Sequence, residues 1–424
     1  MPEIAAFKGI VYNSDRVGNY EHVLCPPYDV IPPDMQEALY AQSDYNAVRL
    51  ELPKEDNKYD IAAERLTAWL RDGILKQHDT DAIYPYHQTF TTKDGAHYTR
   101  KGFIALCKLY EFDKGIVLPH ERTLSGPKKD RLQLFIKTKT NISPIFGLYG
   151  DKEKIVDRAI DAFTASSRPY IDAEDYQHTR NLVWKLDDAE IIQTVKSVLR
   201  EKQMFIADGH HRYETAIAYR NLRREEHPHY TGDEAYNYIM MFMTNIYDDG
   251  LVVFPTHRLV HSLPTLDLTG LLENLHAFFG VQELADKKKV KDFLALYPHG
   301  AFGLVTKEKF YGVHLASDLD KAIPEALPRE LKSLDVVLLH HLILGKMLGI
   351  STEAQALQTN LNYSKDFDDV FDAVESGKAQ LGFLMNPTSV AEVEAVSRIG
   401  EVMPQKSTFF YPKVLTGVVM NSIA

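Results

Sequence analysis

Apolar and polar positions recur with two different periods along this chain, and these periods predict interleaved strands and helices. Residues 82–91 and 97–109 are strand-like and flank Lys93-Asp94-Gly95, a composition typical of a tight turn, so this stretch predicts a β-hairpin. Residues 60–70 place apolar side chains at helical spacing, and Gly73 just beyond them predicts the helix end.

The middle of the chain predicts a strand that runs into a helix. Residues 203–207 form a short apolar run, Asp208-Gly209 interrupts it, and residues 211–224 then have a helical rhythm. Two amphipathic helices, at residues 151–164 and 188–199, precede this passage. Further strands are predicted at residues 141–149, 236–244 and 251–254.

The remaining segments complete a prediction of a mixed α/β protein. Residues 119–129 indicate a polar loop, residues 255–263 a junction into a C-terminal region, and residues 334–348 its most apolar helix. We therefore expect three regions: an N-terminal mixed α/β region at 1–100, a core at 101–255 and a C-terminal α/β region at 256–424.

Composition narrows the classes of partner. The chain has 424 residues, 45% of them hydrophobic, and its 59 acidic residues exceed 48 Lys plus Arg, giving a net charge of −11. This balance argues against general binding to nucleic acid or to anionic membranes. Cys25 and Cys107 offer neither a disulfide framework nor a paired-cysteine metal site, and no window resembles a leader or a membrane span. We expect a cytoplasmic protein without a membrane partner, and the sequence leaves a homo-oligomer open.

The densest chemistry lies at Asp208-Gly209-His210-His211-Arg212, where the predicted strand meets the helix. A helix start offers N–H groups and a partial positive charge, Gly209 allows close approach of the backbone, and Arg212 can grip phosphate oxygens bidentately. This arrangement favours a phosphate-bearing ligand. Asp208 either caps the helix or holds a divalent cation. The alternative is purely structural: Asp208 caps the helix, Gly209 forms the turn, and the remaining residues are a solvated first helical turn.

A second cluster, His120-Glu121-Arg122-Thr123, lies between two strand-like segments and could converge on the first. Glu121 is a natural general base, because a carboxylate within hydrogen-bond reach can accept the proton of a substrate hydroxyl. A solvated charged loop is the alternative. The following run, Lys128-Lys129-Asp130-Arg131, is interpreted as a solvated face.

Two other features favour structural interpretations. Asp29, in the proline-rich turn Pro26-Pro27-Tyr28-Asp29, could contact a cation or substrate, but an acidic residue in a turn commonly satisfies backbone amides. His340-His341 is interpreted as one core and one edge residue rather than a metal pair. The chain lacks G-x-G-x-x-G, H-E-x-x-H, G-x-S-x-G and C-x-x-C, which argues against dinucleotide redox chemistry and serine hydrolysis.

The motif at 208–212 resembles the phosphate site of the ParB/sulfiredoxin-like superfamily, and its two histidines resemble the form found in the free serine kinases of that superfamily. Over its whole length the chain resembles the domain of unknown function 1015 family. The anchors of that second resemblance are Pro26-Pro27-Tyr28-Asp29-Val30-Ile31, His120-Glu121-Arg122-Thr123, Ala207 to Arg212, and Met403-Pro404-Gln405-Lys406-Ser407-Thr408.

The resemblance implies a ParB/sulfiredoxin-like core and a kinase that transfers phosphate from ATP or ADP, with Mg²⁺, to a small hydroxyl metabolite, favoured to be free L-serine. Gly209, His210, His211 and Arg212 would bind the phosphates, with both histidines and Asp208 catalytic and Asp208 holding the metal. Glu121 would be the base, and His120, Arg122 and Thr123 would contact the substrate.

Three alternatives stay open at this point. The same anion site and base could activate water, which would make the protein a phosphatase acting on a small phosphate ester such as phosphoserine. A non-catalytic regulator that binds nucleotide or nucleic acid belongs to another class, and the net acidity counts against the nucleic acid. A metal hydrolase using Asp208, His210 and His211 ranks last, because it would need further ligands from elsewhere.

Overall fold

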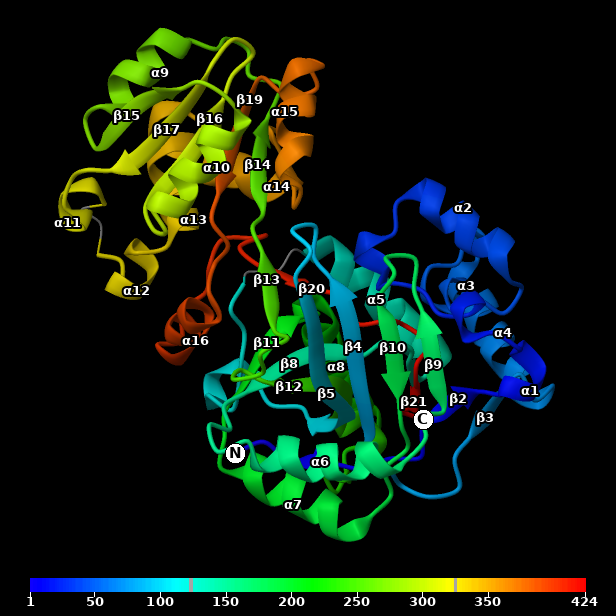
Figure 1. Ribbon diagram of the computed structural model, residues 1–424. Coiled ribbons are helices and arrows are strands. Elements are labelled where there is room, and N and C mark those ends of the chain that lie inside the picture. Colours follow the sequence, from blue (N-terminus) through cyan, green and yellow to red (C-terminus); the bar gives the residue numbers. More distant parts are fainter. Residues whose placement is uncertain (122–124, 324–325) are drawn as a thin grey trace. The chain divides into compact units, whose positions relative to one another are not determined.

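The computed structural model describes residues 1–121, 125–323 and 326–424, with the backbone alone for residues 125–127. The contacts divide these residues into two compact units. Unit 1 comprises residues 1–119, 125–252 and 412–424, and unit 2 comprises residues 120–121 and 253–411 without residues 324–325. Each unit combines a sheet with helices, so the predicted mixed α/β class is confirmed (Figure 1).

The main sheet of unit 1 mixes parallel and antiparallel pairs. Its strands are β1 (Ile4–Ala5), β4 (Tyr84–Thr91), β5 (His97–Lys108), β6 (Val117–Leu118), β8 (Ile145–Tyr149), β9 (Ile171–Glu174), β10 (Arg180–Val183), β11 (Met204–Asp208) and β12 (Tyr238–Asn245). Their order is β6-β11-β8-β12-β5-β4-β10-β9, with β1 beside β5. Two smaller pairs join β2 (Ile10–Tyr12) to β3 (Leu75–Gln77) and β7 (Thr140–Asn141) to β21 (Asn421–Ser422).

Helices cover this sheet, with α6 and α7 side by side (Figure 1). The larger helices of unit 1 are α2 (Pro33–Gln42), α4 (Lys58–Arg71), α5 (Ser125–Thr138), α6 (Ile155–Ser166), α7 (Ala189–Arg200) and α8 (His210–Glu226). The shorter ones are α1 (Ser14–Val17), η1 (Tyr20–His22), η2 (Tyr28–Val30), α3 (Val48–Glu51), η3 (Phe112–Lys114) and η4 (Ala235–Asn237), where these η helices are 3-10 turns.

The two faces of the unit 1 sheet differ in chemistry. Because side chains alternate along a strand, Phe103, Ala105 and Met241 fall on one face and are buried in the apolar core. Arg100 pairs across strands with Gln88, and Phe146 pairs with Asp208, so these side chains lie on the opposite face. Arg100, Gln88 and Asp208 therefore lie on the face opposite the apolar core, where Phe146 and Phe242 are in register with Asp208.

Unit 2 has a six-stranded antiparallel sheet of order β15-β17-β16-β19-β14-β18. Its strands are β14 (His257–Val260), β15 (Phe279–Leu284), β16 (Ala301–Val305), β17 (Phe310–Leu315), β18 (Leu361–Ser364) and β19 (Leu381–Met385), and a separate pair joins β13 (Val252–Phe254) to β20 (Phe409–Tyr411). Its helices are α9 (Leu268–Leu275), α10 (Lys287–Leu296), α11 (Leu319–Ala322), α12 (Arg329–Lys332), α13 (Asp335–Leu338), the π-helix η5 (Leu339–Met347), α14 (Thr352–Leu357), α15 (Phe367–Glu375) and α16 (Val390–Arg398).

The structure confirms the hairpin β4–β5, the helix α4 that ends before Gly73, and the strand-turn-helix from β11 to α8. Two predictions were wrong. The polar loop predicted at 119–129 includes the start of α5, and the junction predicted at 255–263 contains β14, an inner strand of the unit 2 sheet. Strand β5 crosses residue 100, where the first predicted boundary falls; the division into three regions stays a prediction.

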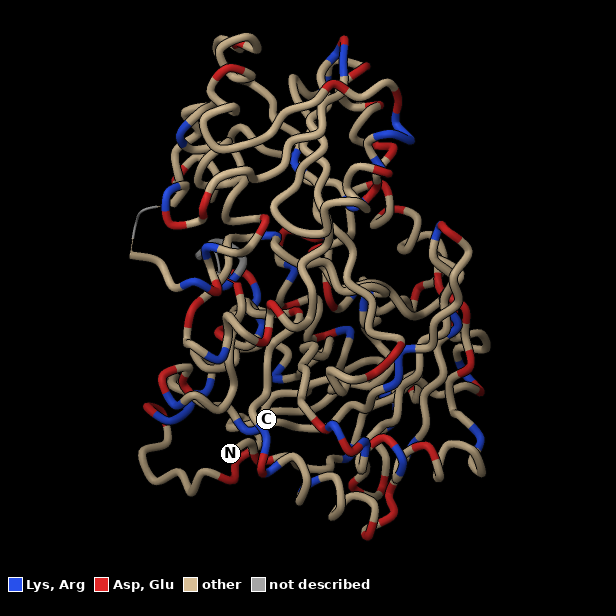
Figure 2. The backbone as a smooth tube through the Cα atoms, turned by 60° about the vertical axis from the view of Figure 1, so that its left-hand side comes forward, with Lys and Arg blue, Asp and Glu red and all other residues tan. Residues whose placement is uncertain are grey.

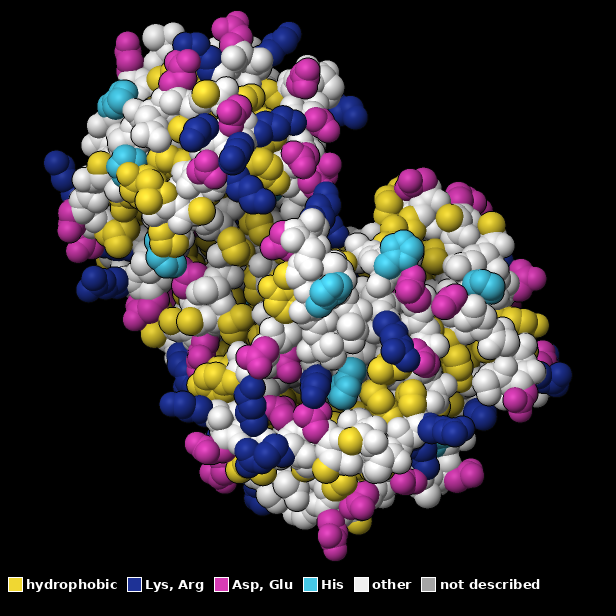
Figure 3. Space-filling view, viewed as in Figure 1, with side chains coloured by type: hydrophobic (Ala, Val, Ile, Leu, Met, Phe, Trp, Pro, Cys, Tyr) yellow, Lys and Arg dark blue, Asp and Glu magenta, His cyan; other side chains and the backbone are white. Residues whose placement is uncertain are grey.

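Charge is distributed without segregation of the two signs. Figure 2 shows acidic and basic residues interspersed along the backbone, and the face visible in Figure 3 has the same mixture. None of the helices in the described part of the chain combines the length and the apolar composition that a membrane crossing requires.

Candidate functional site

The turn between β11 and α8 is built around a glycine. The register of β11 against β8 shifts between Ile206 and Asp208, and Gly209 follows with φ +90°, a conformation that favours glycine. A Cβ at Gly209 would lie 3.1 Å from Nε of Arg212. Gly209 is also the N-cap residue of α8 and gives it no side-chain cap, and the capping role of the preceding Asp208 stays a prediction.

Arg212 is buried beneath this turn, with 5% of its surface exposed. Its Nη1 donates to Oγ of Ser143 at 3.2 Å and to the carbonyl oxygen of Pro144 at 2.5 Å, while Nη2 lies 3.6 Å from Oδ2 of Asp208. These contacts fix the guanidinium under the start of α8. Arg212 therefore brings its charge to the 208–212 turn and supports the turn.

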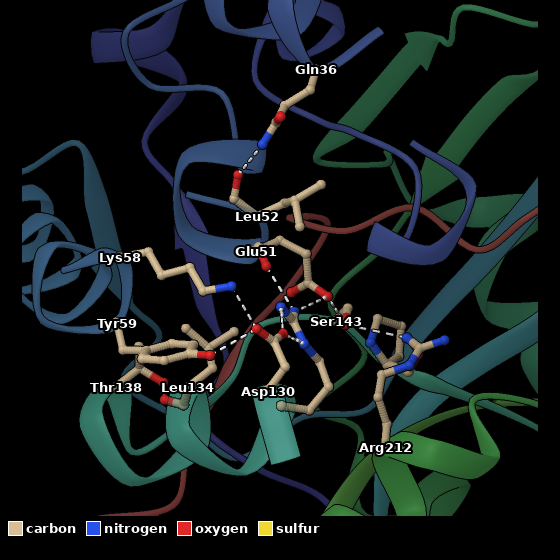
Figure 4. Close-up of polar contacts among 12 residues, drawn as sticks. Gln36, Glu51, Leu52, Lys58, Tyr59, Asp130, Leu134, Thr138, Ser143 and Arg212 are labelled. Carbon is tan, nitrogen blue, oxygen red and sulfur yellow. Dashed lines mark hydrogen bonds and ion pairs between the residues drawn. The ribbon is translucent and has the colours of Figure 1, made fainter. Parts of the chain in front are cut away.

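A chain of buried polar side chains continues from Arg212 toward the surface (Figure 4). Oγ of Ser143 donates to Oε1 of Glu51 at 3.0 Å, and Nη1 of Arg131 donates to the backbone oxygen of Glu51 at 2.7 Å. Arg131 also pairs with Asp130, to which Lys58 donates at 2.6 Å. Glu51 and Arg131 are each 2% exposed, so the interpretation of Arg131 as part of a solvated face was wrong.

The proline-rich turn Pro26-Pro27-Tyr28-Asp29 joins the same network. The guanidinium of Arg131 lies over the ring of Tyr28, 4.2 Å from its centroid. Burial raises the pKa of Tyr28 to about 12, and the charges of Arg212 and Arg131 oppose that rise, which indicates that both cations are close to its hydroxyl. Asp29, beside it, is exposed. The proline-rich turn of the N-terminal region thus lies beside the 208–212 turn.

Asp208 faces a second cation from a distant part of the chain. Nζ of Lys413 lies 3.5 Å from Oδ1 of Asp208, and both side chains are largely buried. The carboxylate thus lies between Lys413 and Arg212. Asp208 holds two cations at the turn in this arrangement, and the last segment of unit 1 supplies one of them.

A third cation, Arg100, lies fully buried on the same face of the sheet as Asp208. Its Nη2 donates to Gln88 and, at 2.6 Å, to the carbonyl oxygen of Pro412, but within the described residues Nε and Nη1 have no hydrogen-bond partner. The guanidinium stacks on Phe146 at 4.7 Å. Burial lowers the pKa of Arg100 to about 10, and Asp248 and Asp208 act against that decrease. A buried cation that lacks a carboxylate partner is costly, which is typical of a residue retained for function.

The two histidines begin α8 at different depths. His210 is buried at 8% exposure and His211 is half-buried. One turn further, Glu214 forms an ion pair with Lys128 of α5, so the run at 128–131 contacts α8 rather than solvent alone. Tyr213 lies in the core, and its hydroxyl donates to the carbonyl oxygen of Tyr110 at 2.9 Å. The first turn of α8 is therefore packed between the apolar core, through Tyr213, and the polar contacts of Arg212 and Glu214.

The second predicted cluster belongs to unit 2. His120 is fully buried, and its Nε2 lies 2.9 Å from Oγ1 of Thr408. The backbone of Glu121 pairs with that of Met403 in an isolated parallel β-bridge. These contacts join the cluster to the motif at 403–408. Arg122 and Thr123 lie outside the described residues. The structure places Glu121 in unit 2 and Asp208 in unit 1, and the pairing of the two clusters stays a prediction.

The donors at the turn do not fit a metal ion held by the protein. Among the described residues, no three side chains of His, Cys, Asp or Glu gather as such a site requires. The Asp208 carboxylate faces Arg212 and Lys413, whose positive charges oppose the binding of a cation there. We assign no step to Mg²⁺ bound by Asp208.

Comparison with solved structures gives distant similarities. The chain is similar to a conserved hypothetical protein from Pyrococcus furiosus (16% identity, 71% of this chain and 88% of that chain, TM-score 0.34). It is similar to a free serine kinase in complex with AMP (15%, 71% and 85%, 0.34) and to SbnI with C-terminal truncation from Staphylococcus aureus (11%, 73% and 85%, 0.35).

A comparison with protein-family models shows which family the chain belongs to. No curated protein matches the chain significantly. The family model described as "Protein of unknown function (DUF1015)" matches residues 4–337, well over half of the sequence, which confirms the family predicted from the motifs. The chain therefore belongs to the DUF1015 family.

Proposed function

We propose that unit 1 binds the phosphate groups of ATP or ADP at the 208–212 turn and transfers a phosphoryl group to a small hydroxyl metabolite, with free L-serine as the favoured acceptor. The observation that carries the proposal is the gathering of three largely buried cations, Arg100, Arg212 and Lys413, at the turn. The resemblance of Asp208-Gly209-His210-His211-Arg212 to the motif of free serine kinases supports the choice of nucleotide and acceptor.

Three cations lie near the turn. Arg212 and Lys413 form ion pairs with the carboxylate of Asp208, and Arg100 lies on the same face of the sheet. The N-terminus of α8 adds the positive end of a helix dipole. These cations and the helix dipole would stabilise a nucleotide phosphate bound at the turn. In phosphoryl transfer, positioned donors and cations of this kind stabilise the charge on the transferring group.

The acceptor hydroxyl needs a base, and the chain offers two candidates that can be tested separately. Glu121 is the base implied by the resemblance and belongs to unit 2. Asp29 is an exposed carboxylate of unit 1 that follows Tyr28 beside Arg131 and Arg212. Loss of transfer with nucleotide binding intact, in Glu121→Gln or in Asp29→Asn, identifies the base.

The experiment incubates the purified full chain with L-serine, MgCl₂ and either ATP or ADP and measures phosphoserine by ³¹P NMR, with nucleotide affinity from calorimetry. Lys413→Gln should weaken nucleotide binding, because it removes a cation from Asp208. Lys185→Gln is the matched control, because Lys185 is a partly exposed lysine that pairs with Asp187. A chain that neither binds nucleotide nor forms phosphoserine would contradict the proposal.

Two outcomes favour the alternatives. Release of phosphate from phosphoserine without nucleotide would indicate a phosphatase that uses the same anion site. Nucleotide or DNA binding without turnover, unchanged in both carboxylate variants, would indicate a regulator.

A further inference from the structure

Unit 2 contains a mostly apolar cavity of about 220 Å³ that the proposed phosphate chemistry does not use. Its walls come from α12–α14, η5, β18 and residues 402–405, and the lining residues include Leu331, Val337, Ala356, Tyr363, Pro404 and Gln405. Pro404 and Gln405 belong to the motif at 403–408, to which the proposed function assigns no role. A cavity of about 150 Å³ can hold a benzene ring, so this one has room for a ring with a short substituent.

Among the described residues, no Lys, Arg, Asp or Glu lines the cavity. His340 does line it, but burial and the charge of Arg258 lower the pKa of His340 to about 3, so its ring is neutral. Arg258 itself lies behind the wall, fully buried, and the negative charge of Glu121 opposes the decrease in its pKa to about 10. A charged ligand would lose its hydration in the cavity without gaining a lining counterion of fixed charge, so the cavity favours a neutral ligand.

Two polar residues of the lining, His340 and Gln355, already use their side-chain polar atoms within the protein. Because a guanidinium only donates, Nε2 of His340 accepts from Nε of Arg258 at 3.1 Å, and Nδ1 then donates to Oε1 of Gln355 at 2.9 Å. Nε2 of Gln355 donates to the carbonyl oxygens of His340 and Ile350, at 3.2 Å and 2.8 Å. These bonds fix the tautomer of His340, so its ring and that of Tyr363 contribute aromatic surface to the lining.

Thr352 and Gln405 also line the cavity, and neither side chain forms a hydrogen bond with another described residue. A hydroxyl and a primary amide each donate and accept, so together they can bind a neutral polar group such as an amide or a hydroxyl. Thr352 is exposed and Gln405 half-buried, whereas Leu331 and Val337 are buried. The lining is therefore apolar where it is buried and offers hydrogen bonds where it is closer to solvent.

We propose that this cavity binds a small, neutral aromatic molecule with one hydrogen-bonding group, which is directed to Thr352 and Gln405. The aromatic rings of His340 and Tyr363 favour an aromatic ligand over an aliphatic one, because rings gain from offset or edge-to-face packing. His340 lies on η5, a π-helix, and such helices are rare and frequent at functional sites. The site would exist whether or not unit 1 is a kinase.

The experiment titrates the full chain with three probes at neutral pH and measures their affinities by ligand-observed NMR. Benzamide should bind saturably, and benzoate, its charged isostere, should bind about tenfold or more weakly, because its carboxylate would be desolvated without a counterion. Cyclohexanecarboxamide, which keeps the amide but not the aromatic ring, should bind about fivefold more weakly than benzamide. No saturable binding of benzamide, or an equal affinity for either of the other probes, would overturn the proposal without any variant.

Variants then locate the site. Ala356→Phe fills the cavity from α14 and should abolish binding of benzamide, and Thr352→Val, which removes the hydroxyl but keeps the shape, should weaken it about fivefold. Thr359→Val, at an exposed threonine that does not line the cavity, is the matched control and should leave the affinity unchanged. Full binding in a folded Ala356→Phe variant, or in Thr352→Val, would contradict this location. Nucleotide binding should be unchanged in all three variants, which separates this site from the proposed function of unit 1.

Discussion

Arg100→Met is the substitution that best separates stability from function in unit 1. The change removes a fully buried guanidinium whose Nε and Nη1 have no described hydrogen-bond partner. Each unpaired buried donor costs about 1–3 kcal/mol, and the substitution removes that cost. It also leaves the oxygens of Gln88 and Pro412 without their donor, which costs a similar amount. We expect the free energy of unfolding to change by less than about 2 kcal/mol, whereas breaking a well-paired buried ion pair costs about 3–5 kcal/mol.

The effect on ligand binding should be much clearer. A unit charge about 8 Å from a phosphate contributes about 2 kcal/mol at an effective dielectric constant of about 20. Removal of the charge of Arg100 should therefore weaken ADP binding about 30-fold. Arg100→Lys keeps the charge and should retain most of the affinity.

The assay pairs urea denaturation with calorimetric titration of ADP, and Arg180→Met, at an exposed arginine that pairs with Asp172, is the matched control. Two results would refute the reasoning. A loss of stability above about 4 kcal/mol would show that Arg100 is a structural residue. Unchanged affinity for ADP in a folded Arg100→Met variant would show that its charge does not reach the ligand.

Three further predictions concern other parts of the two units. Gly209→Ala should lower the free energy of unfolding by about 1–2 kcal/mol, because φ +90° is strained for alanine and the new Cβ crowds Arg212; urea denaturation measures this loss. Glu51→Gln should cost about 2 kcal/mol, because it weakens the contact of Oε1 with Ser143 and removes the ion pair with Arg131, and ADP affinity should fall with it in calorimetry, since the contacts that support Arg212 are disturbed. Burial raises the pKa of Asp335 to about 7, so the native state binds the extra proton and stability falls as pH rises from about 4 to 7. In Asp335→Asn this pH dependence should be reduced. If the free energy of unfolding, measured by denaturation at several pH values, falls with pH as steeply as before, the assignment to Asp335 is contradicted.

The sequence predicted the local structure of the phosphate motif well, for a physical reason. A strand, a glycine and a helix start follow one another in the chain, and the conformations of Asp208 to Arg212 depend on near neighbours. The prediction failed where distant segments meet. Arg131 was interpreted as solvated because adjacent charges are typical of a surface, but Glu51 and Tyr28 bury it.

Two cations of the site were missed for the same reason. Lys413 follows Pro412 in a segment without any pattern that links it to Asp208, and only the fold brings the two together. Arg100 did offer a signal, because it lies inside a predicted strand and alternation places it on the same face as the apolar Ile104 and Leu106. A basic residue at an inward position of a predicted strand is therefore worth treating as a candidate site residue.

The return of the chain to unit 1 after unit 2 has a consequence for synthesis. Pro412 and Lys413 contact Arg100 and Asp208, but they follow residues 253–411, all of unit 2 except its first two described residues. At roughly 5–20 residues per second, a ribosome needs about 10–30 seconds to make that stretch. During this time the nascent chain contains the 208–212 turn but not Lys413, which pairs with the carboxylate of Asp208 in the folded protein. The proposed anion site would therefore be completed only after unit 2 has emerged, so the proposed activity would follow the synthesis of unit 2.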